Sequence, residues 1–260
     1  MNESQPVQPK KILGQYFLKN TTAIMQSINA LRMQPGETVI EIGPGAGALT
    51  GPLSTQCVRI GCQLIAVEKD EYLAGQIKTP NTTVVIGDIL AELPTLAAKL
   101  KSYKVIGNIP YYITGALLRV LSELEHKPSM AVLMLQKEVA ERICVQAGEM
   151  NLLAAATQVW AQPKLLLTLK PSDFEPAPAV YSAVIELKTK DHGLSAEELK
   201  KYYAALHRIF KQPRKMLINN LLDPLTRPEA EKNLGALDIP LTNRPQDLSI
   251  DQILELSKKI

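Results

Sequence analysis

Short apolar runs alternate along the first two thirds of the chain with longer segments of mixed polarity. The runs that have the length and composition of buried strands are residues 38–42, 64–67, 84–87, 105–107 and 131–136. The segments between them are long enough for helices, and residues 137–145 have a helical pattern. This alternation from about residue 21 to 188 predicts an α/β fold with a doubly wound parallel sheet. Two further runs, 164–169 and 180–187, predict a closing strand pair at an antiparallel edge.

The pattern changes after residue 190, where strand-like runs stop. Asp191-His192-Gly193 forms a hinge-like break, and Ser195 with Glu198 has the spacing of a capping box at a helix start. Three later segments have helical spacing, at residues 214–222, 228–234 and 249–258. We therefore predict two domains, a sheet domain over residues 1–190 and a small helical domain over residues 191–260.

The first predicted strand runs directly into Gly43-Pro44-Gly45-Ala46-Gly47. Glycines are needed where the backbone turns sharply and approaches a ligand, and the start of the following helix offers free N–H groups. The loop predicts a nucleotide-type cofactor site. A tight turn between a strand and a helix would use the same residues, so the loop alone is weak support.

Polar side chains end the next three predicted strands. Glu68 follows one strand, Asp88 another, and Asn108 the fourth. An acid about 20 residues beyond a glycine loop can accept hydrogen bonds from both ribose hydroxyls. Asp88 can accept from an adenine amino group. Ligands of open α/β sheets bind at the carboxyl ends of the strands, so this ordered series predicts one site.

The glycine loop, continued by Ala48, also fits the looser dinucleotide fingerprint. Three features favour S-adenosylmethionine over NAD. Glu41 precedes the loop, where it can position a methionine amino group. Asp88 suits a single adenosine, and residues 108–111 have no use in hydride transfer.

Asn108-Ile109-Pro110-Tyr111 is a combination suited to methyl transfer onto a planar NH₂ group. The Asn108 side-chain oxygen and the backbone carbonyl of Pro110 can accept the two amino hydrogens, and Pro110 fixes the turn. Tyr111 offers a face on which a planar base can stack. A strand end, a proline turn and a core aromatic residue are the alternative interpretation of the motif by itself.

Composition narrows the functional class only modestly. The chain has 260 residues, of which 46% are hydrophobic, and a formal net charge of +3. That charge does not by itself demand a nucleic-acid partner. Its three cysteines lack the spacing of a disulfide framework or a zinc site, so we expect thiols in a reducing compartment and no metal. With neither a signal-peptide pattern nor a membrane-spanning run, we expect a cytoplasmic protein.

Motifs spread along the whole chain carry a family resemblance. The chain resembles the KsgA-type ribosomal RNA adenine N6,N6-dimethyltransferases, with a Rossmann-like methyltransferase sheet and a small C-terminal helical domain. The matching segments are residues 11–18, 41–45, 108–111, 135–142, 174–182, 211–217 and 244–249.

The resemblance implies roles for particular residues. Tyr16, Leu18, Gly43, Glu68, Asp88 and Asn108 fall at the family's methyl-donor contacts, to which the loop analysis adds Glu41 and Gly45. Asn108, Pro110 and Tyr111 fall at its target-base site. Phe174 matches a second aromatic residue, which is expected to sandwich the flipped adenine against Tyr111.

Two departures from the family pattern stand out. Tyr16 replaces the more usual His or Asn, which should affect a cofactor contact and not the fold. Residues 143–151 lack the Pro-Gly-x-x-x-Tyr-Gly segment that family members usually carry near the presumed RNA entrance. That loss bears on substrate choice more than on chemistry.

The implied activity is S-adenosylmethionine-dependent dimethylation of two adjacent adenines in the 3′-terminal hairpin loop of small-subunit (16S) rRNA. The expected RNA contacts are Lys10, Lys11, Arg208, Lys211, Arg214 and Lys215, together with Lys19 on the arm. We expect a monomer whose partner is the rRNA of the small ribosomal subunit within a pre-assembled particle. The alternatives are an Erm-type enzyme acting on large-subunit (23S) rRNA and a non-catalytic ribosome-assembly factor of the same fold. A DNA adenine methyltransferase and a dinucleotide oxidoreductase are more remote.

Overall fold

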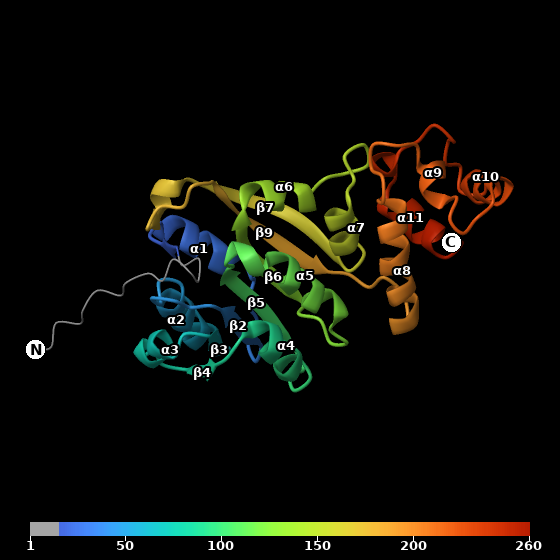
Figure 1. Cartoon of the computed structure of the whole chain (residues 1–260). Helices are drawn as coiled ribbons and strands as arrows, with labels where there is room; N and C mark the ends of the chain where they lie inside the picture. Colours follow the sequence, from blue (N-terminus) through green and yellow to red (C-terminus); the bar gives the residue numbers. More distant parts are fainter. Residues whose placement is uncertain (1–15) are drawn as a thin grey trace, which may run out of the picture. The chain divides into compact units, whose positions relative to one another are not determined.

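A computed structural model describes residues 16–260, which form two compact units (Figure 1). The first unit comprises the described residues up to Ala140 together with Lys164–Thr189, and the second comprises Glu141–Pro163 together with Lys190–Ile260. The chain therefore leaves the first unit and returns to it before the boundary predicted at residue 190. Residues 141–163 join the C-terminal unit because the Gly148 and Met150 amides donate to the Gln246 carbonyl, at 2.8 and 3.1 Å.

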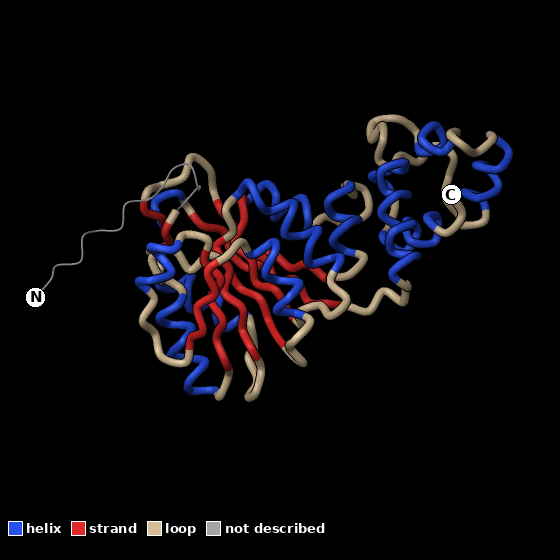
Figure 2. The backbone as a smooth tube through the Cα atoms, turned by 60° about the horizontal axis from the view of Figure 1, so that its bottom comes forward, coloured by secondary structure: helices blue, strands red, loops and turns tan. Residues whose placement is uncertain are grey.

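A mixed sheet, drawn in red in Figure 2, forms the centre of the first unit. It has seven strands in the order β4-β3-β2-β5-β6-β9-β7. Its strands are β2 (Thr38–Ile42), β3 (Gln63–Glu68), β4 (Thr82–Ile86), β5 (Tyr103–Asn108), β6 (Met130–Gln136), β7 (Ala161–Leu169) and β9 (Ser182–Thr189). The pairs from β4 through β6 are parallel, whereas β6 and β9 are antiparallel. The predicted α/β fold, its five parallel strands and its antiparallel edge are confirmed.

The register of the parallel strands brings their carboxyl ends to one edge. Ile42 pairs with Val67 on one side and with Gly107 on the other. The glycine loop therefore starts directly after β2, beside Asn108, the last residue of β5. Gly107 is required here, because a Cβ at this position would lie 2.7 Å from the Ile42 carbonyl oxygen.

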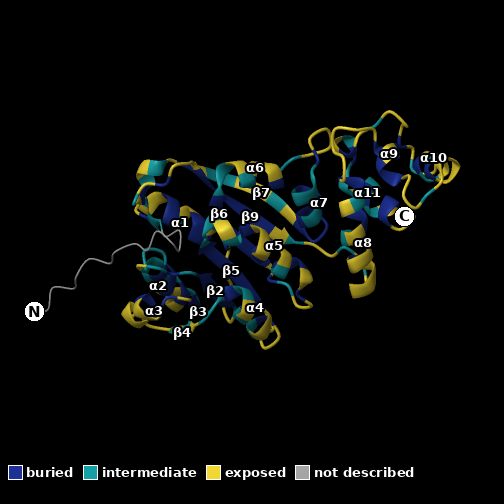
Figure 3. Ribbon diagram, in the orientation of Figure 1, coloured by how far each residue is buried: buried dark blue, intermediate teal, exposed yellow. Residues whose placement is uncertain are grey.

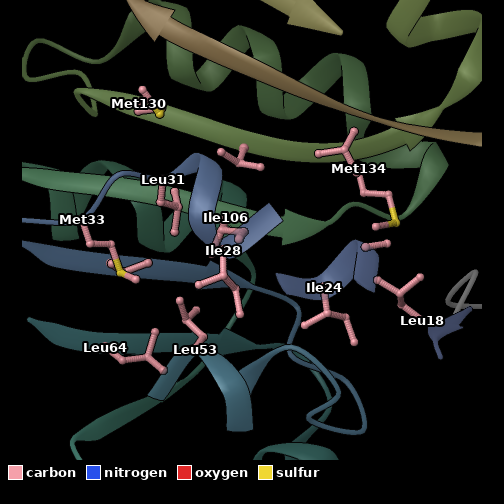
Figure 4. Close-up of a cluster of buried hydrophobic side chains, with 14 of the residues drawn as sticks. Leu18, Ile24, Ile28, Leu31, Met33, Leu53, Leu64, Ile106, Met130 and Met134 are labelled. Atoms are coloured by element: carbon pink, nitrogen blue, oxygen red, sulfur yellow. The ribbon is translucent and has the colours of Figure 1, made fainter. Parts of the chain in front are cut away.

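Helices flank this sheet. They are α1 (Thr21–Ala30), α2 (Thr50–Ile60), α3 (Glu71–Gln76), α4 (Ile89–Ala97) and α5 (Thr114–Glu123), with α6 (Lys137–Ile143) crossing into the second unit. Figure 4 shows side chains of α1 and α2, such as Ile28 and Leu53, beside Leu64 and Ile106 of the sheet. Burial of this apolar cluster stabilises the layer, at about 25 cal/mol per Å² of apolar surface. In Figure 3 the central strands are almost wholly buried, whereas the edge strand β4 is not.

A two-stranded sheet joins the N-terminal arm to a distant segment. In it β1 (Phe17–Leu18) pairs antiparallel with β8 (Phe174–Glu175). The short helix η3 (Pro171–Asp173) precedes β8. The Lys19 amide donates to the Asp173 carbonyl at 2.7 Å, and the Asn20 amide group donates to the Asp173 carboxylate at 3.1 Å. The start of the described chain is thus held beside the sheet.

The second unit is helical, as predicted for residues beyond 190. Its helices are α7 (Leu152–Gln158), α8 (Ala196–Ile209), α9 (Leu217–Leu221), α10 (Arg227–Gly235), η4 (Pro245–Asp247) and α11 (Ile250–Ser257). The predicted capping box is present, since Ser195 and Glu198 exchange side-chain and backbone hydrogen bonds at 2.8 and 3.3 Å. Helix α9 is shorter than predicted, because Arg214 and Lys215 lie in the turn that precedes it.

Candidate active site

A cavity opens at the carboxyl ends of the parallel strands in the first unit. Every cofactor or base residue predicted from the sequence lines it, with the exception of Phe174. Those residues are Tyr16, Leu18, Glu41, Gly43, Gly45, Glu68, Asp88, Asn108, Pro110 and Tyr111. The strand ends thus bring together residues spread over nearly a hundred positions of sequence, as the register requires.

The glycine loop lies against the arm and against β3. Gly43, Gly45 and Gly47 all have positive φ angles, which suit glycine because it has no Cβ. A Cβ on Gly45 would lie 2.9 Å from Cε1 of Phe17, so the arm packs directly on the loop backbone. The Gly45 amide donates to Oε2 of Glu68 at 3.0 Å. These contacts fix the loop conformation at the cavity wall.

Glu41 presents a buried carboxyl group with one unused acceptor. Its side chain is 1% exposed, and Oε1 accepts a hydrogen bond from the Thr50 hydroxyl at 3.0 Å. Oε2 is buried without a hydrogen-bond partner among the described residues. Burial raises the pKa of Glu41 to about 8, and the nearby Glu68 carboxylate adds to the increase. This carboxyl group requires either a proton or a cationic donor from the cavity.

Glu68 is held by two backbone amides. Oε2 accepts from Gly45, and Oε1 accepts from the Asp70 amide at 2.9 Å. Each carboxylate oxygen keeps a lone pair after these bonds. Glu68 is therefore a fixed acceptor at the cavity wall.

Asp88 lies at the outer part of the cavity. It caps helix α4 by accepting from the Leu90 amide at 3.0 Å, and it forms an ion pair with Lys69 at 2.9 Å. The hydrogen bond from Lys69 holds the pKa of Asp88 below its usual value. Since Asp88 remains ionised at neutral pH, it can accept a hydrogen bond from an adenine amino group.

The orientation of the Asn108 amide is set by the arm. Its Nδ2 donates to the backbone carbonyl of Tyr16 at 2.7 Å. Because a carbonyl can only accept, this bond assigns the nitrogen to the arm and leaves Oδ1 as the acceptor. The Pro110 carbonyl accepts from the Ile113 amide at 3.1 Å and keeps a second lone pair. Both acceptors predicted for the amino hydrogens are therefore present.

Tyr111 is half-buried in the cavity wall, within the short helix η2 (Tyr111–Ile113). Its hydroxyl is 2.9 Å from the Ser182 hydroxyl. The rings of Tyr16 and Tyr111 are stacked, with centroids 5.8 Å apart and an interplanar angle of 30°. An aromatic surface thus lies beside the Asn108 acceptor.

Phe174 lies elsewhere than the sequence predicts. It is 2% exposed and belongs to the same buried cluster as Leu18, its partner across the β1–β8 pair. It is absent from the cavity lining among the described residues, and the ring stacked on Tyr111 is that of Tyr16. Strand pairing with the arm is the physical reason, because it covers the Phe174 side chain.

Four residues of the site were not singled out from the sequence: Thr50, Lys69, Tyr112 and Ser182. Lys69 follows Glu68 directly, so its position at the strand end was a usable signal. Tyr112 also lines the cavity and is 63% exposed. The hydroxyl partners Thr50 and Ser182 carry no sequence pattern that would distinguish them.

The residues predicted to contact RNA fall into two groups. Lys10 and Lys11 lie outside the described residues. In the second unit, Arg208 lies in the last turn of α8, and Lys211, Arg214 and Lys215 are exposed in the segment that leads to α9. Asn220 holds this segment by donating to the carbonyls of Ile209 and Gln212, at 2.8 and 3.3 Å.

The shortened segment 143–151 is well anchored within the second unit. Gln158 donates to the carbonyls of Ile143 and Val145, at 2.9 and 2.8 Å. Asn151 caps α7 and donates to the Arg142 carbonyl at 2.9 Å. Together with the bonds from Gly148 and Met150 to Gln246, these contacts fix the segment as a compact turn.

Two further features are absent from residues 16–260. No group of three or more His, Cys, Asp or Glu residues there is arranged to hold a metal ion. No helix in this part of the chain has the length and apolar character to cross a membrane.

Comparison with known proteins gives consistent results. The family model for ribosomal RNA adenine dimethylase matches residues 7–260. The chain is 34% identical over 279 residues to Ribosomal RNA small subunit methyltransferase A of Koribacter versatilis, covering 99% of this chain and 96% of that protein. It is 36% identical over 266 residues to the protein of that name from Latilactobacillus sakei, with 95% and 88% covered.

Two crystal structures show the same fold. The 23S rRNA methyltransferase ErmE is similar with a TM-score of 0.75 at 24% identity, covering 94% of this chain and 98% of that one. A dimethyladenosine transferase from Plasmodium falciparum gives a TM-score of 0.76 at 22% identity, with 92% and 95% covered. Since the family model spans nearly the whole chain and the relatives match it end to end, the protein belongs to the ribosomal RNA adenine dimethylase family.

Proposed function

We propose that the protein transfers methyl groups from S-adenosylmethionine to N6 of two adjacent adenines in the 3′-terminal hairpin loop of small-subunit rRNA. The observation that carries this proposal is the orientation of the Asn108 amide. Its nitrogen donates to the Tyr16 carbonyl, so its oxygen is left to accept a hydrogen bond from the target amino group. The Pro110 carbonyl and the Tyr111 ring line the same cavity. Relatives named as small-subunit methyltransferases support the choice of rRNA.

The cavity residues fit S-adenosylmethionine. The unpartnered Oε2 of Glu41 matches the ammonium of its methionine part, Glu68 matches its ribose, and Asp88 matches its adenine. When bound, this group supplies an activated methyl and a neutral leaving group. Leu18 and the glycine-loop residues Gly43 and Gly45 would shape the walls around it.

Asn108 and Pro110 act on the nucleophile. The lone pair of adenine N6 is delocalised into the ring, which makes the amino group a weak nucleophile. Two acceptors that hold both amino hydrogens favour a pyramidal nitrogen and release the lone pair for attack on the methyl carbon. Positioning and electrostatic stabilisation therefore carry the catalysis.

Removal of the proton from the methylated nitrogen requires no strong base from the protein. The attacked nitrogen becomes strongly acidic once it is alkylated, so water can take the proton. No histidine is present among the described residues that line the cavity. A second methylation requires the monomethylated amino group to rotate and to keep one acceptor, which Asn108 or Pro110 supplies.

We expect the cavity to recognise the target base, and basic residues of the helical unit and the arm to contact the RNA phosphates. An adenine within a duplex cannot reach the cavity, so the target must be unpaired or flipped and then stacked on an aromatic side chain. The exposed cations Lys211, Arg214 and Lys215, with Arg208 beside them, are suited to phosphate contacts. Lys10, Lys11 and Lys19 would add contacts from the arm.

The partner and setting follow from the same reasoning. We infer that the protein acts as a monomer and that it works in the cytoplasm on a partly assembled small subunit. An Erm-type activity on large-subunit rRNA is the second candidate. The likeness to ErmE concerns the fold, whereas the more similar relatives carry the small-subunit name.

Replacement of Asn108 by Ala tests the catalytic assignment. Methyl transfer to the hairpin RNA should fall by about 10²-fold or more, because the amino group loses an acceptor in the transition state. The dissociation constant for S-adenosylmethionine, measured by calorimetry, should change by only a few-fold. Asn233→Ala, in which the lost amide bonds only to the exposed Lys259 carbonyl, is the matched control. Near-normal transfer by Asn108→Ala would refute the assignment.

The raised pKa of Glu41 predicts that cofactor binding depends on pH. In the free protein the carboxyl keeps its proton below pH 8, whereas a bound ammonium would favour the ionised form. Binding should therefore release up to one proton, and affinity should rise with pH by at most about tenfold per unit until it levels off near pH 8.

Calorimetry in buffers of different ionisation enthalpy measures this proton release. The Glu41→Gln variant should bind S-adenosylmethionine more weakly, and its binding should lack the proton release that Glu41 contributes. Subtracting the proton release of the variant from that of the unchanged protein also cancels the titration of the cofactor's own amino group. Equal proton release by the variant and by the unchanged protein would contradict the role of Glu41.

The basic segment before α9 is tested by charge removal. The triple variant Lys211→Ala, Arg214→Ala, Lys215→Ala should bind hairpin RNA more weakly and lower the slope of log K against log salt by about two. A control variant removes equal charge from exposed positions of the same unit, Lys200, Lys232 and Lys259. Identical slopes for the two variants would mean that the segment has no specific phosphate contacts.

A further inference from the structure

Tyr16 covers an aromatic face that the proposed function requires. Its ring is stacked on that of Tyr111 with centroids 5.8 Å apart, and both side chains line the cavity. The Tyr16 ring therefore covers one face of Tyr111 at the cavity wall. A flipped adenine needs such a face beside the Asn108 acceptor.

The position of Tyr16 is fixed by the residues that follow it. Phe17 and Leu18 pair with β8, and the Phe17 ring packs against Gly45 of the glycine loop. Lys19 forms an exposed ion pair with Glu175 at 3.0 Å in addition to its backbone bond to Asp173. The main chain of Tyr16 is also held by the bond from Asn108 to its carbonyl. The Tyr16 backbone is thus anchored, and its half-buried side chain packs against the buried cluster and on the Tyr111 ring.

The space between the two rings is too small for a base. A centroid separation of 5.8 Å is that of rings in direct contact, whereas a base inserted between them requires about twice a single stacking distance. Adenine and the Tyr16 ring therefore compete for the same face. Rotation of the Tyr16 side chain would free it without disturbing the carbonyl that orients Asn108.

We propose that Tyr16 is a gate over the target-base position, a specificity-determining side chain that holds the stacking face of Tyr111 until an adenine displaces it. This inference rests on the proposed function. Water is excluded from the Tyr111 face in the absence of RNA, and a base that stacks weakly fails to displace the ring.

The test uses a hairpin RNA in which one of the two adjacent loop adenines is replaced by 2-aminopurine, whose fluorescence is quenched on stacking. Tyr16→Ala and Tyr16→Asn remove the ring and keep the backbone carbonyl on Asn108. Both should bind the probe about twofold to tenfold more tightly and quench it more fully, because the competing stack is lost. Tyr16→Phe keeps the ring, so its affinity for the probe and its quenching of the probe should match those of the unchanged protein.

Kinetics separate the gate from other roles. The variants without the ring should have a KM for unmodified hairpin RNA that is lower by the same factor as the gain in probe affinity. Their dissociation constant for S-adenosylmethionine should change less than their RNA affinity. Weaker probe binding by Tyr16→Ala would overturn the proposal, because Tyr16 would then be a supporting wall of the base site. A larger change in cofactor affinity than in RNA affinity would also overturn it, in favour of a cofactor contact.

The proposed methyl transfer and the proposed Tyr16 gate can fail separately. If the unchanged protein binds the probe and transfers no methyl group, the proposed function is wrong while the ratio of probe affinities still decides the role of Tyr16. If it methylates the RNA and the Tyr16 variants bind the probe no more tightly, the gate is wrong and the proposed function stands.

Discussion

The parallel pairing of β2 with β3 and β5 is the constraint on which the site depends. In-register pairing places Gly43, Glu68 and Asn108 at or just beyond neighbouring strand ends, so that residues far apart in sequence share one cavity. The approach of β5 to β2 is close enough that Gly107 cannot carry a Cβ without meeting the Ile42 carbonyl oxygen. A shift in this register would separate the glycine loop from Asn108, and the cofactor and base sites would no longer adjoin.

The arm adds a second layer of control over the same edge. Pairing of β1 with β8 brings Phe17 onto the glycine loop and the Tyr16 carbonyl onto the Asn108 amide. One short segment therefore contacts the glycine loop, the Asn108 amide and the Tyr111 ring. The sheet forms the cavity, whereas the arm accepts a hydrogen bond from the Asn108 amide and covers a face of the Tyr111 ring.

Much of this arrangement could be predicted from the sequence, because each parallel strand is an apolar run followed by a glycine, acid or amide. The capping box at Ser195 was also predictable, since it depends on local spacing. Contacts between distant segments were not. Phe174 is buried by pairing with a segment more than 150 residues away. Residues 141–163 join the helical unit through bonds to Gln246, which no local pattern indicates. Likewise, the Tyr16–Tyr111 stack depends on where the arm docks.

The most direct test of the central claim is transfer of labelled methyl groups from S-adenosylmethionine to small and large ribosomal subunits isolated from cells that lack the modification, followed by mapping of the product. The account predicts N6,N6-dimethyladenosine at two adjacent positions in the 3′-terminal hairpin of the small-subunit rRNA. That result would also show that the compact 143–151 turn suffices for substrate choice. Label confined to the large subunit, or none in either subunit while the cofactor still binds, would contradict the account.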